Sequence, residues 1–114
     1  PRVFVSNSRD IANFVKANNQ VHFIYFDNIL KSTLPYLHND NYDISYFANK
    51  NRTKDTIQFY TVKSYLKLDK INYSIWANCD EISDLVNENG DKIKFSLVKD
   101  FRNRYCVYKT EYIK

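Results

Sequence analysis

The order of apolar and polar positions divides this chain into short segments with either helical or strand-like spacing. Ile11, Phe14 and Val15 recur at helical spacing. They follow a polar run in which Asn7 can act as the N-cap of a helix. Two Asn residues at 18–19 favour a left-handed stop. These positions predict a first helix between Asn7 and residues 18–19.

Strand-like segments flank this helix and dominate the second half of the chain. Residues 2–5 and 21–26 are mostly apolar, and the strand–helix–strand order predicts a parallel pair, with the second strand in the centre of a sheet. Tyr42, Ile44 and Tyr46 alternate within a polar stretch that also has the character of a loop. The clearest period-two alternation lies in residues 56–63, 71–77 and 92–97. Residues 104–113 are predicted to form the last strand.

Two further segments have helical features. Asp27 can cap a short helix that Pro35 ends. Residues 80–87 fit either a two-turn helix or the first arm of a hairpin, because Asn89-Gly90 favours a type I′ turn. Together the segments predict an α+β fold: a single mixed β-sheet of five or six strands, with one or two short helices packed on one face. Residues 1–114 are expected to form one globular domain.

The composition is that of an ordered globular chain. Hydrophobic residues make up 44% of the 114 positions, and there are only one Gly and two Pro. The abundant Asn, Lys, Ile, Tyr and Phe are all encoded by A/T-rich codons, which indicates a phage, a large virus or a low-GC bacterium as the source. Part of the aromatic and lysine excess therefore needs no functional cause.

Membrane segments and metal motifs are not apparent in the sequence. The apolar runs are shorter than the roughly 18 residues of a membrane span, and no signal-peptide pattern leads the chain. We therefore expect a cytoplasmic protein (in the host cytoplasm, if phage- or virus-encoded) without a membrane partner. There, Cys79 and Cys106 favour free, buried thiols, with a disulfide as the alternative. No CxxC or clustered His accompanies them, so neither a metal nor a cofactor is expected.

Charge is distributed unevenly. Residues 1–49 are balanced, residues 50–70 carry +4, residues 71–91 carry −5 and residues 92–114 carry +5. Basic residues beside aromatic residues on neighbouring strands attract phosphate and stack bases. The sequence therefore predicts a small basic accessory protein that binds single-stranded DNA or RNA through its C-terminal strands. The candidate binding residues are Arg52, Lys54, Tyr60, Lys63, Lys92, Lys94, Arg102, Arg104 and Tyr108.

Two alternatives remain open. If residues 80–87 are helical, Asp80, Asp84 and Glu88 form an acidic stripe. The stripe would pair with the chain's own Lys and Arg, or would dock a basic partner in a protein-interaction module that inhibits or modulates a host enzyme. Second, His22 and His38 allow a metal-independent ribonuclease in which one imidazole is the acid and the other the base. The binding hypothesis assigns no catalytic residue.

Overall fold

The computed structural model describes residues 8–26, 42–47, 59–77, 82–102 and 104–114. The strand predicted at residues 2–5 and the helix predicted after Asp27 lie outside the described residues.

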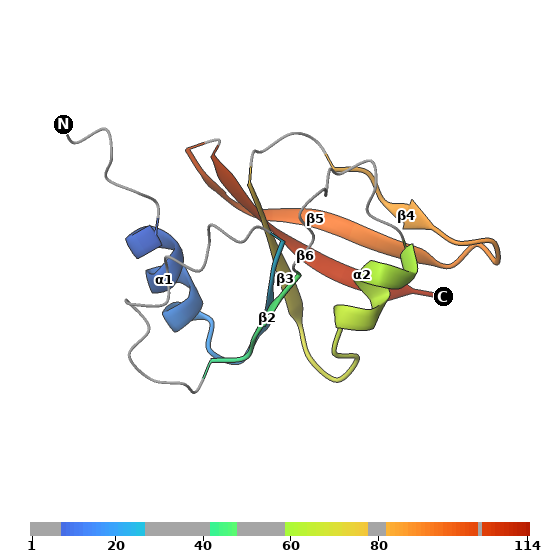
Figure 1. Ribbon diagram of the computed structural model, residues 1–114, viewed down its shortest axis with the longest axis horizontal. Coiled ribbons are helices and arrows are strands. Elements are labelled where there is room, and N and C mark those ends of the chain that lie inside the picture. Colours follow the sequence, from blue (N-terminus) through green and yellow to red (C-terminus); the bar gives the residue numbers. More distant parts are fainter. Residues whose placement is uncertain (1–7, 27–41, 48–58, 78–81, 103) are drawn as a thin grey trace.

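The described residues form one mixed six-stranded sheet and two helices (Figure 1). In chain order these are α1 (Ser8–Ala17), β1 (His22–Tyr25), β2 (Ile44–Tyr46), α2 (Phe59–Tyr65), β3 (Asn72–Ala77), β4 (Leu85–Val86), β5 (Lys92–Phe101) and β6 (Tyr105–Ile113). The strand order is β2-β1-β3-β6-β5-β4. β1 is parallel to β2 and β3, and the other neighbours are antiparallel. The predicted α+β fold with a single mixed sheet is confirmed, and β1 has the predicted central position.

Helix α1 forms where the apolar spacing predicts it, but it ends differently. Ile11, Ala12 and Val15 are buried, and Asp10 lies in the first turn, where a carboxylate is favoured by the exposed amides. Among the described residues only Gly90 and Arg102 have a positive φ, so Asn18 does not adopt the predicted left-handed stop. Its side-chain Nδ2 instead donates a hydrogen bond of 2.8 Å to the carbonyl of Phe14. A side-chain amide therefore satisfies a free carbonyl at this helix end.

The two helices cover opposite faces of the sheet, whereas the sequence predicted one face. Along β1, Phe23 and Tyr25 pack with the buried side of α1, while Ile24 and the adjoining Phe26 pack with the buried side of α2. Successive side chains of a strand point to opposite faces. Because β1 is apolar on both faces, a helix must pack on each face to bury these side chains.

Helix α2 replaces a predicted strand. Residues 59–65, within the segment predicted as a strand at 56–63, are helical. Phe59 and Val62, three positions apart, are both buried on the face that also contains Trp76. The short segment satisfies both the two-residue and the helical spacing, and burial of Phe59 and Val62 against the sheet favours the helix.

The hairpin alternative is correct for residues 82–87, although the turn is of another type. β4 pairs with β5, and Gly90 has a φ of 83°. Asn89 does not have the positive φ that a type I′ turn requires. Gly90 N donates to Asn87 O at 3.1 Å, and Asn87 Oδ1 accepts from the main-chain N of Asn89 and of Asp91. Asn87 N also donates to Asp91 O at 3.0 Å, which leaves residues 88–90 as a three-residue loop. In this loop only Gly90 has the left-handed conformation.

The β5–β6 hairpin contains a bulge that changes which side chains share a face. Leu97 pairs with Tyr108 and Lys99 pairs with Val107, so Val98 is an extra residue in β5. An inserted residue reverses the alternation beyond it. Ile93 and Phe95 therefore face α2, whereas Phe101, an odd-numbered residue after the bulge, faces α1.

Cys106 on β6 is disulfide-bonded, and no cysteine of the described residues is free. The expectation of a free thiol is therefore wrong for Cys106. The other cysteine of the chain, Cys79, lies outside the described residues. Neither helix of the described residues has the length and apolar character needed to cross a membrane.

Candidate nucleic-acid interface

The structure divides the predicted binding residues between the two faces of the sheet. Lys92 and Lys94 alternate with the buried Ile93 and Phe95, so they lie on the face that α1 partly covers. Tyr60 and Lys63 belong to α2, on the other face. The Tyr60 hydroxyl donates to Glu88 Oε2 at 2.8 Å, and Lys63 Nζ lies 4.5 Å from the ring centre of Tyr112. These two groups therefore do not form one continuous surface.

Three further predicted residues have contrasting positions. Tyr108 is only 7% exposed and packs edge-to-face on Phe95, with 6.2 Å between ring centres, so its ring is not available to stack on a base. Arg102 and Arg104 are exposed in the turn between β5 and β6. Arg52 and Lys54 lie outside the described residues.

Four lysines share the α1-side face of the β5–β6 hairpin, and we call them the lysine strip. Lys92 and Lys94 come from β5, and Lys109 lies opposite Ser96 in the next cross-strand row of β6. Lys99 joins them because the bulge places it opposite Val107, which packs on the α1 side. Lys92, Lys94 and Lys99 are exposed, and the Lys109 side chain is 43% exposed. The sequence identified two of these lysines and missed Lys99 and Lys109, because neither the bulge nor the β5–β6 register is visible in it.

An aromatic cluster adjoins the lysine strip on the same face. Tyr73 of β3 lies directly opposite Lys109. The ring of Phe14 stacks near that of Tyr73, with 6.1 Å between centres and 26° between planes. Phe14 also lies 5.9 Å from Phe101 in an edge-to-face arrangement. Basic and aromatic side chains are thus neighbours on this face, and the aromatic residues are Phe14, Tyr73 and Phe101.

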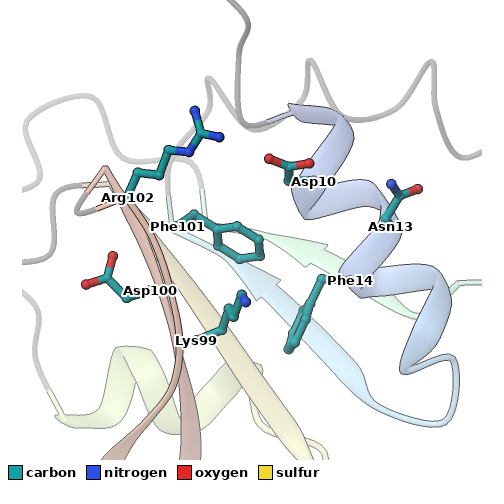
Figure 2. Close-up of a pocket in the computed structure, with 7 residues that line it drawn as sticks. All are labelled: Asp10, Asn13, Phe14, Lys99, Asp100, Phe101 and Arg102. Carbon is teal, nitrogen blue, oxygen red and sulfur yellow. The ribbon is translucent and has the colours of Figure 1, made fainter.

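A pocket of about 420 Å³ lies where the lysine strip meets α1. Figure 2 shows Asp10, Asn13 and Phe14 along the helix, and the Phe101 ring between the helix and the end of β5. The remaining lining residues are Lys99, Asp100 and Arg102. Lys99 Nζ is 5.7 Å from the centre of the Phe101 ring. In this view Asp100 points away from α1, so its carboxylate is directed away from the helix side of the pocket.

A second hollow, of about 250 Å³, lies beside Lys109 and is lined in part by Lys67 and Lys70. Both of these lysines donate to Asp43, with Nζ–Oδ distances of 2.6 and 2.8 Å. Partial burial raises the pKa of Asp43, but the two hydrogen bonds outweigh it and leave the pKa below its ordinary value. Asp43 therefore stays ionised and offsets part of the charge of Lys67 and Lys70. These two lysines lie between α2 and β3, outside the β5–β6 hairpin, so they are not part of the lysine strip.

The acidic block does not form the predicted ion pairs within the described residues. Asp84 Oδ1 accepts from the main-chain N of Phe95 at 3.1 Å, so it caps the strand edge and does not belong to a helical stripe. Asp91 Oδ2 accepts from the Tyr112 hydroxyl at 3.0 Å, as Glu88 does from Tyr60. Among the described residues no Lys or Arg lies within ion-pair distance of Asp84, Glu88 or Asp91. Asp80 lies outside the described residues.

His22 has the environment of a structural histidine. It is fully buried, with Nδ1 2.7 Å from Asn72 Oδ1 and Nε2 2.8 Å from Ser45 Oγ. Asn72 Oδ1 also accepts from Lys67 N, which fixes it as an acceptor and makes Nδ1 of His22 the protonated nitrogen. Burial lowers the pKa of His22, so the neutral ring is favoured. His38, its predicted catalytic partner, lies outside the described residues.

Among the described residues, no group of three or more His, Cys, Asp or Glu side chains is arranged to hold a metal ion. No protein-family model matches this chain, and no curated protein or solved structure is significantly similar to it.

Proposed function

We propose that this protein binds single-stranded DNA or RNA through the lysine strip. The observation that carries the proposal is that four lysines from two neighbouring strands are exposed on one face, beside the aromatic cluster of Phe14, Tyr73 and Phe101. A positively charged surface that follows the phosphate backbone next to aromatic rings is the common design of single-strand binders. No catalytic step is part of this proposal.

The geometry favours an extended strand along β5. Lys92 and Lys94 are two residues apart on one strand face, a separation of about 6.8 Å. Lys109 and Lys99 continue the same face toward α1 and the hairpin turn. Arg102 and Arg104 add exposed positive charge at that end. A backbone laid along this line would meet Lys92 and Lys94, with Glu111 across from Lys94, before it reaches Lys109 and the aromatic cluster.

We also propose a source and a cellular location for the protein. The A/T-rich amino-acid usage supports a phage- or virus-encoded accessory protein. A cytoplasmic location stays a prediction, and the disulfide bond at Cys106 argues against it, because disulfides are rare in the reducing cytoplasm.

The test is fluorescence anisotropy with a labelled single-stranded 12-mer of mixed sequence. Four phosphate contacts predict a log–log salt slope of about −3, since each contributes about 0.7 on single strands. The double variant Lys92→Gln/Lys94→Gln should lower affinity at about 50 mM salt at least tenfold and should roughly halve the slope. The matched control is Lys16→Gln/Lys63→Gln, which removes the same charge from α1 and α2 and should change affinity less than about threefold.

Two results would overturn the proposal. One is undetectable or salt-independent binding at about 50 mM salt, where phosphate contacts are weakly screened. The other is an equal loss in the control variant, which would show that total charge matters and the lysine strip does not. Both double variants need melting curves close to that of the wild-type protein.

A second candidate is a protein-interaction module that acts on a host protein. It is favoured by Leu97 and Val98, which are 60% and 40% exposed on the part of β5 that has no pairing with β4. Exposed apolar side chains on an open strand edge can add a partner's strand. This candidate predicts that Leu97→Ser removes capture of a host protein, whereas Lys92→Gln/Lys94→Gln leaves capture unchanged.

A further inference from the structure

The pocket between α1 and the end of β5 differs in chemistry from the lysine strip that leads to it. Phe14 and Phe101 supply its apolar surface, and Lys99 and Arg102 supply positive charge from the hairpin. Asp10 and Asn13 line the pocket from α1, across from the hairpin (Figure 2). A simple phosphate site would not combine an aromatic surface with a carboxylate and an amide, so the pocket fits a ligand with three chemically distinct parts.

We propose that this pocket holds one nucleotide and selects bases that carry an exocyclic amino group. The base lies against Phe14 and Phe101, its phosphate is bound by Lys99 and Arg102, and its amino group donates to Asp10. The inference rests on the proposed single-strand binding and adds to it a site with base preference.

Size and apolar surface fit a base. The volume of about 420 Å³ is within the range of roughly 300–1,000 Å³ that is typical of small-ligand pockets. Phe14 is only half-buried although it contacts Phe101 and Tyr73, so part of its ring stays open to a ligand. Stacking of a base on an aromatic side chain contributes about 1–3 kcal/mol per base to binding.

The phosphate side of the pocket continues the lysine strip. Lys99 belongs to both, so a strand that follows the strip arrives at the pocket without a gap in positive charge. Arg102 has a φ of 56°, which is unfavourable for a residue other than Gly, Asn or Asp. The hairpin turn therefore has an arginine where the backbone favours Asn or Gly. Functional sites are where such strained residues gather.

The residues on the helix side of the pocket determine which base is preferred. Within the described part of the chain, neither Asp10 nor Asn13 makes a side-chain hydrogen bond or an ion pair. An ionised carboxylate only accepts hydrogen bonds, and it repels phosphate. An amino group of adenine, cytosine or guanine donates to it. The N–H of uracil or thymine lies between two carbonyl oxygens that the carboxylate repels, so Asp10 disfavours these bases.

The experiment is an amide-detected NMR titration with single nucleotides, which tests the pocket apart from the strip. Wild-type protein is titrated with AMP, CMP and UMP, and chemical shifts of residues 10–14 and 99–102 are followed. AMP and CMP should shift these residues, and UMP should bind at least about tenfold more weakly, the effect of losing one charge-assisted hydrogen bond. Asp10→Asn should reduce the preference to less than twofold. Asp69→Asn removes an exposed carboxylate that does not line the pocket, and this variant should keep the preference.

Each outcome decides one of the two proposals. Equal affinity for CMP and UMP overturns the base selection, and no shift at residues 10–14 or 99–102 with any nucleotide overturns the site itself. If oligonucleotides bind with the expected salt slope and the pocket shows no shift, single-strand binding stands and the pocket proposal fails. If mononucleotides bind the pocket and oligonucleotides do not bind, the reverse holds. Should Asp10→Asn unfold α1, Asn13→Ala and Arg102→Asn serve as second variants with affinity for CMP as the readout.

Discussion

Lys109 Nζ lies 3.8 Å from Oε2 of Glu111, two residues further along the same face of β6. Both side chains are 43% exposed. Glu111 is also directly opposite Lys94 of the lysine strip. A single carboxylate therefore adjoins two of the four lysines. Ion pairs of this exposure contribute about 0–1 kcal/mol to stability. Under the proposed function, the main effect of Glu111 would be to compete with phosphate for these two lysines.

Replacing Glu111 tests this competition. Glu111→Gln removes the negative charge and should raise affinity for a single-stranded 12-mer by roughly two- to fivefold at about 50 mM salt. The gain should shrink as salt increases, because exposed charges are screened. Anisotropy titrations at two salt concentrations measure both effects. A loss of affinity in Glu111→Gln would show that the strip is not the phosphate-binding surface.

The turn residue Arg102 should show opposite effects on stability and on binding. Arg102→Asn places a residue that tolerates the left-handed conformation at this position, so the free energy of unfolding should stay constant or rise by up to about 1 kcal/mol. Affinity for oligonucleotides should fall, because one cation is lost at the pocket. Urea titration and anisotropy measure the two quantities. Arg104→Asn is the control for charge alone, since Arg104 has no positive φ. If both variants lose stability equally, the strain at Arg102 does not contribute.

Protonation of His22 should destabilise the fold. Burial keeps the pKa of His22 below its ordinary value of 6.5, so the unfolded chain binds a proton at a higher pH than the folded one. The contribution of His22 to the free energy of unfolding is therefore fully present above pH 6.5, and it is lost as the pH drops from 6.5 through the pKa of His22 in the folded protein. Urea melts between pH 5 and 8 should show this fall in wild-type protein and in a His38→Gln control. His22→Gln should lack this component and should lose about 1–3 kcal/mol at pH 7.5, since Asn72 and Ser45 lose their partner.

The disulfide at Cys106 should be a large contributor to stability. Cys106→Ser should lower the free energy of unfolding by about 2–4 kcal/mol, and a reductant should lower that of wild-type protein by a similar amount. Denaturant titrations with and without reductant compare the two. Identical wild-type curves under both conditions, together with a free thiol count of two on the unfolded chain, would rule out the bridge.

The sequence predicted strands well where the spacing of apolar residues fits only one type of secondary structure. β3 and β6 were predicted near their observed bounds, because their alternation or apolar character is strong. The start of β5 was also predicted, but the strand continues to Phe101, beyond the predicted residues 92–97, because the bulge at Val98 breaks the alternation. The segment at 59–65 failed, because Phe59 and Val62 fit a helix while Phe59 and Thr61 fit a strand, and only contact with the sheet decides between them.

The candidate binding surface could be predicted only in outline. Tyr108 was assigned to an exposed face, but Cys106, Val107 and Tyr108 are all buried, because β6 lies between β3 and β5 and is covered on both sides there. Tyr73 and Lys109 are opposite each other only because β3 and β6 are neighbours. Residue spacing cannot reveal a pairing between segments so far apart in the chain.

The single extra residue at Val98 makes the surface depend on the backbone path of β5 as well as on its residue types. If β5 kept Val98 but formed no bulge, simple alternation would turn Lys99 and Phe101 toward α2. Deleting Val98 would instead leave both on the α1 side, because Lys99 would then follow Leu97 directly. A substitution that straightened the bulge would therefore remove Lys99 from the lysine strip without replacing any basic residue.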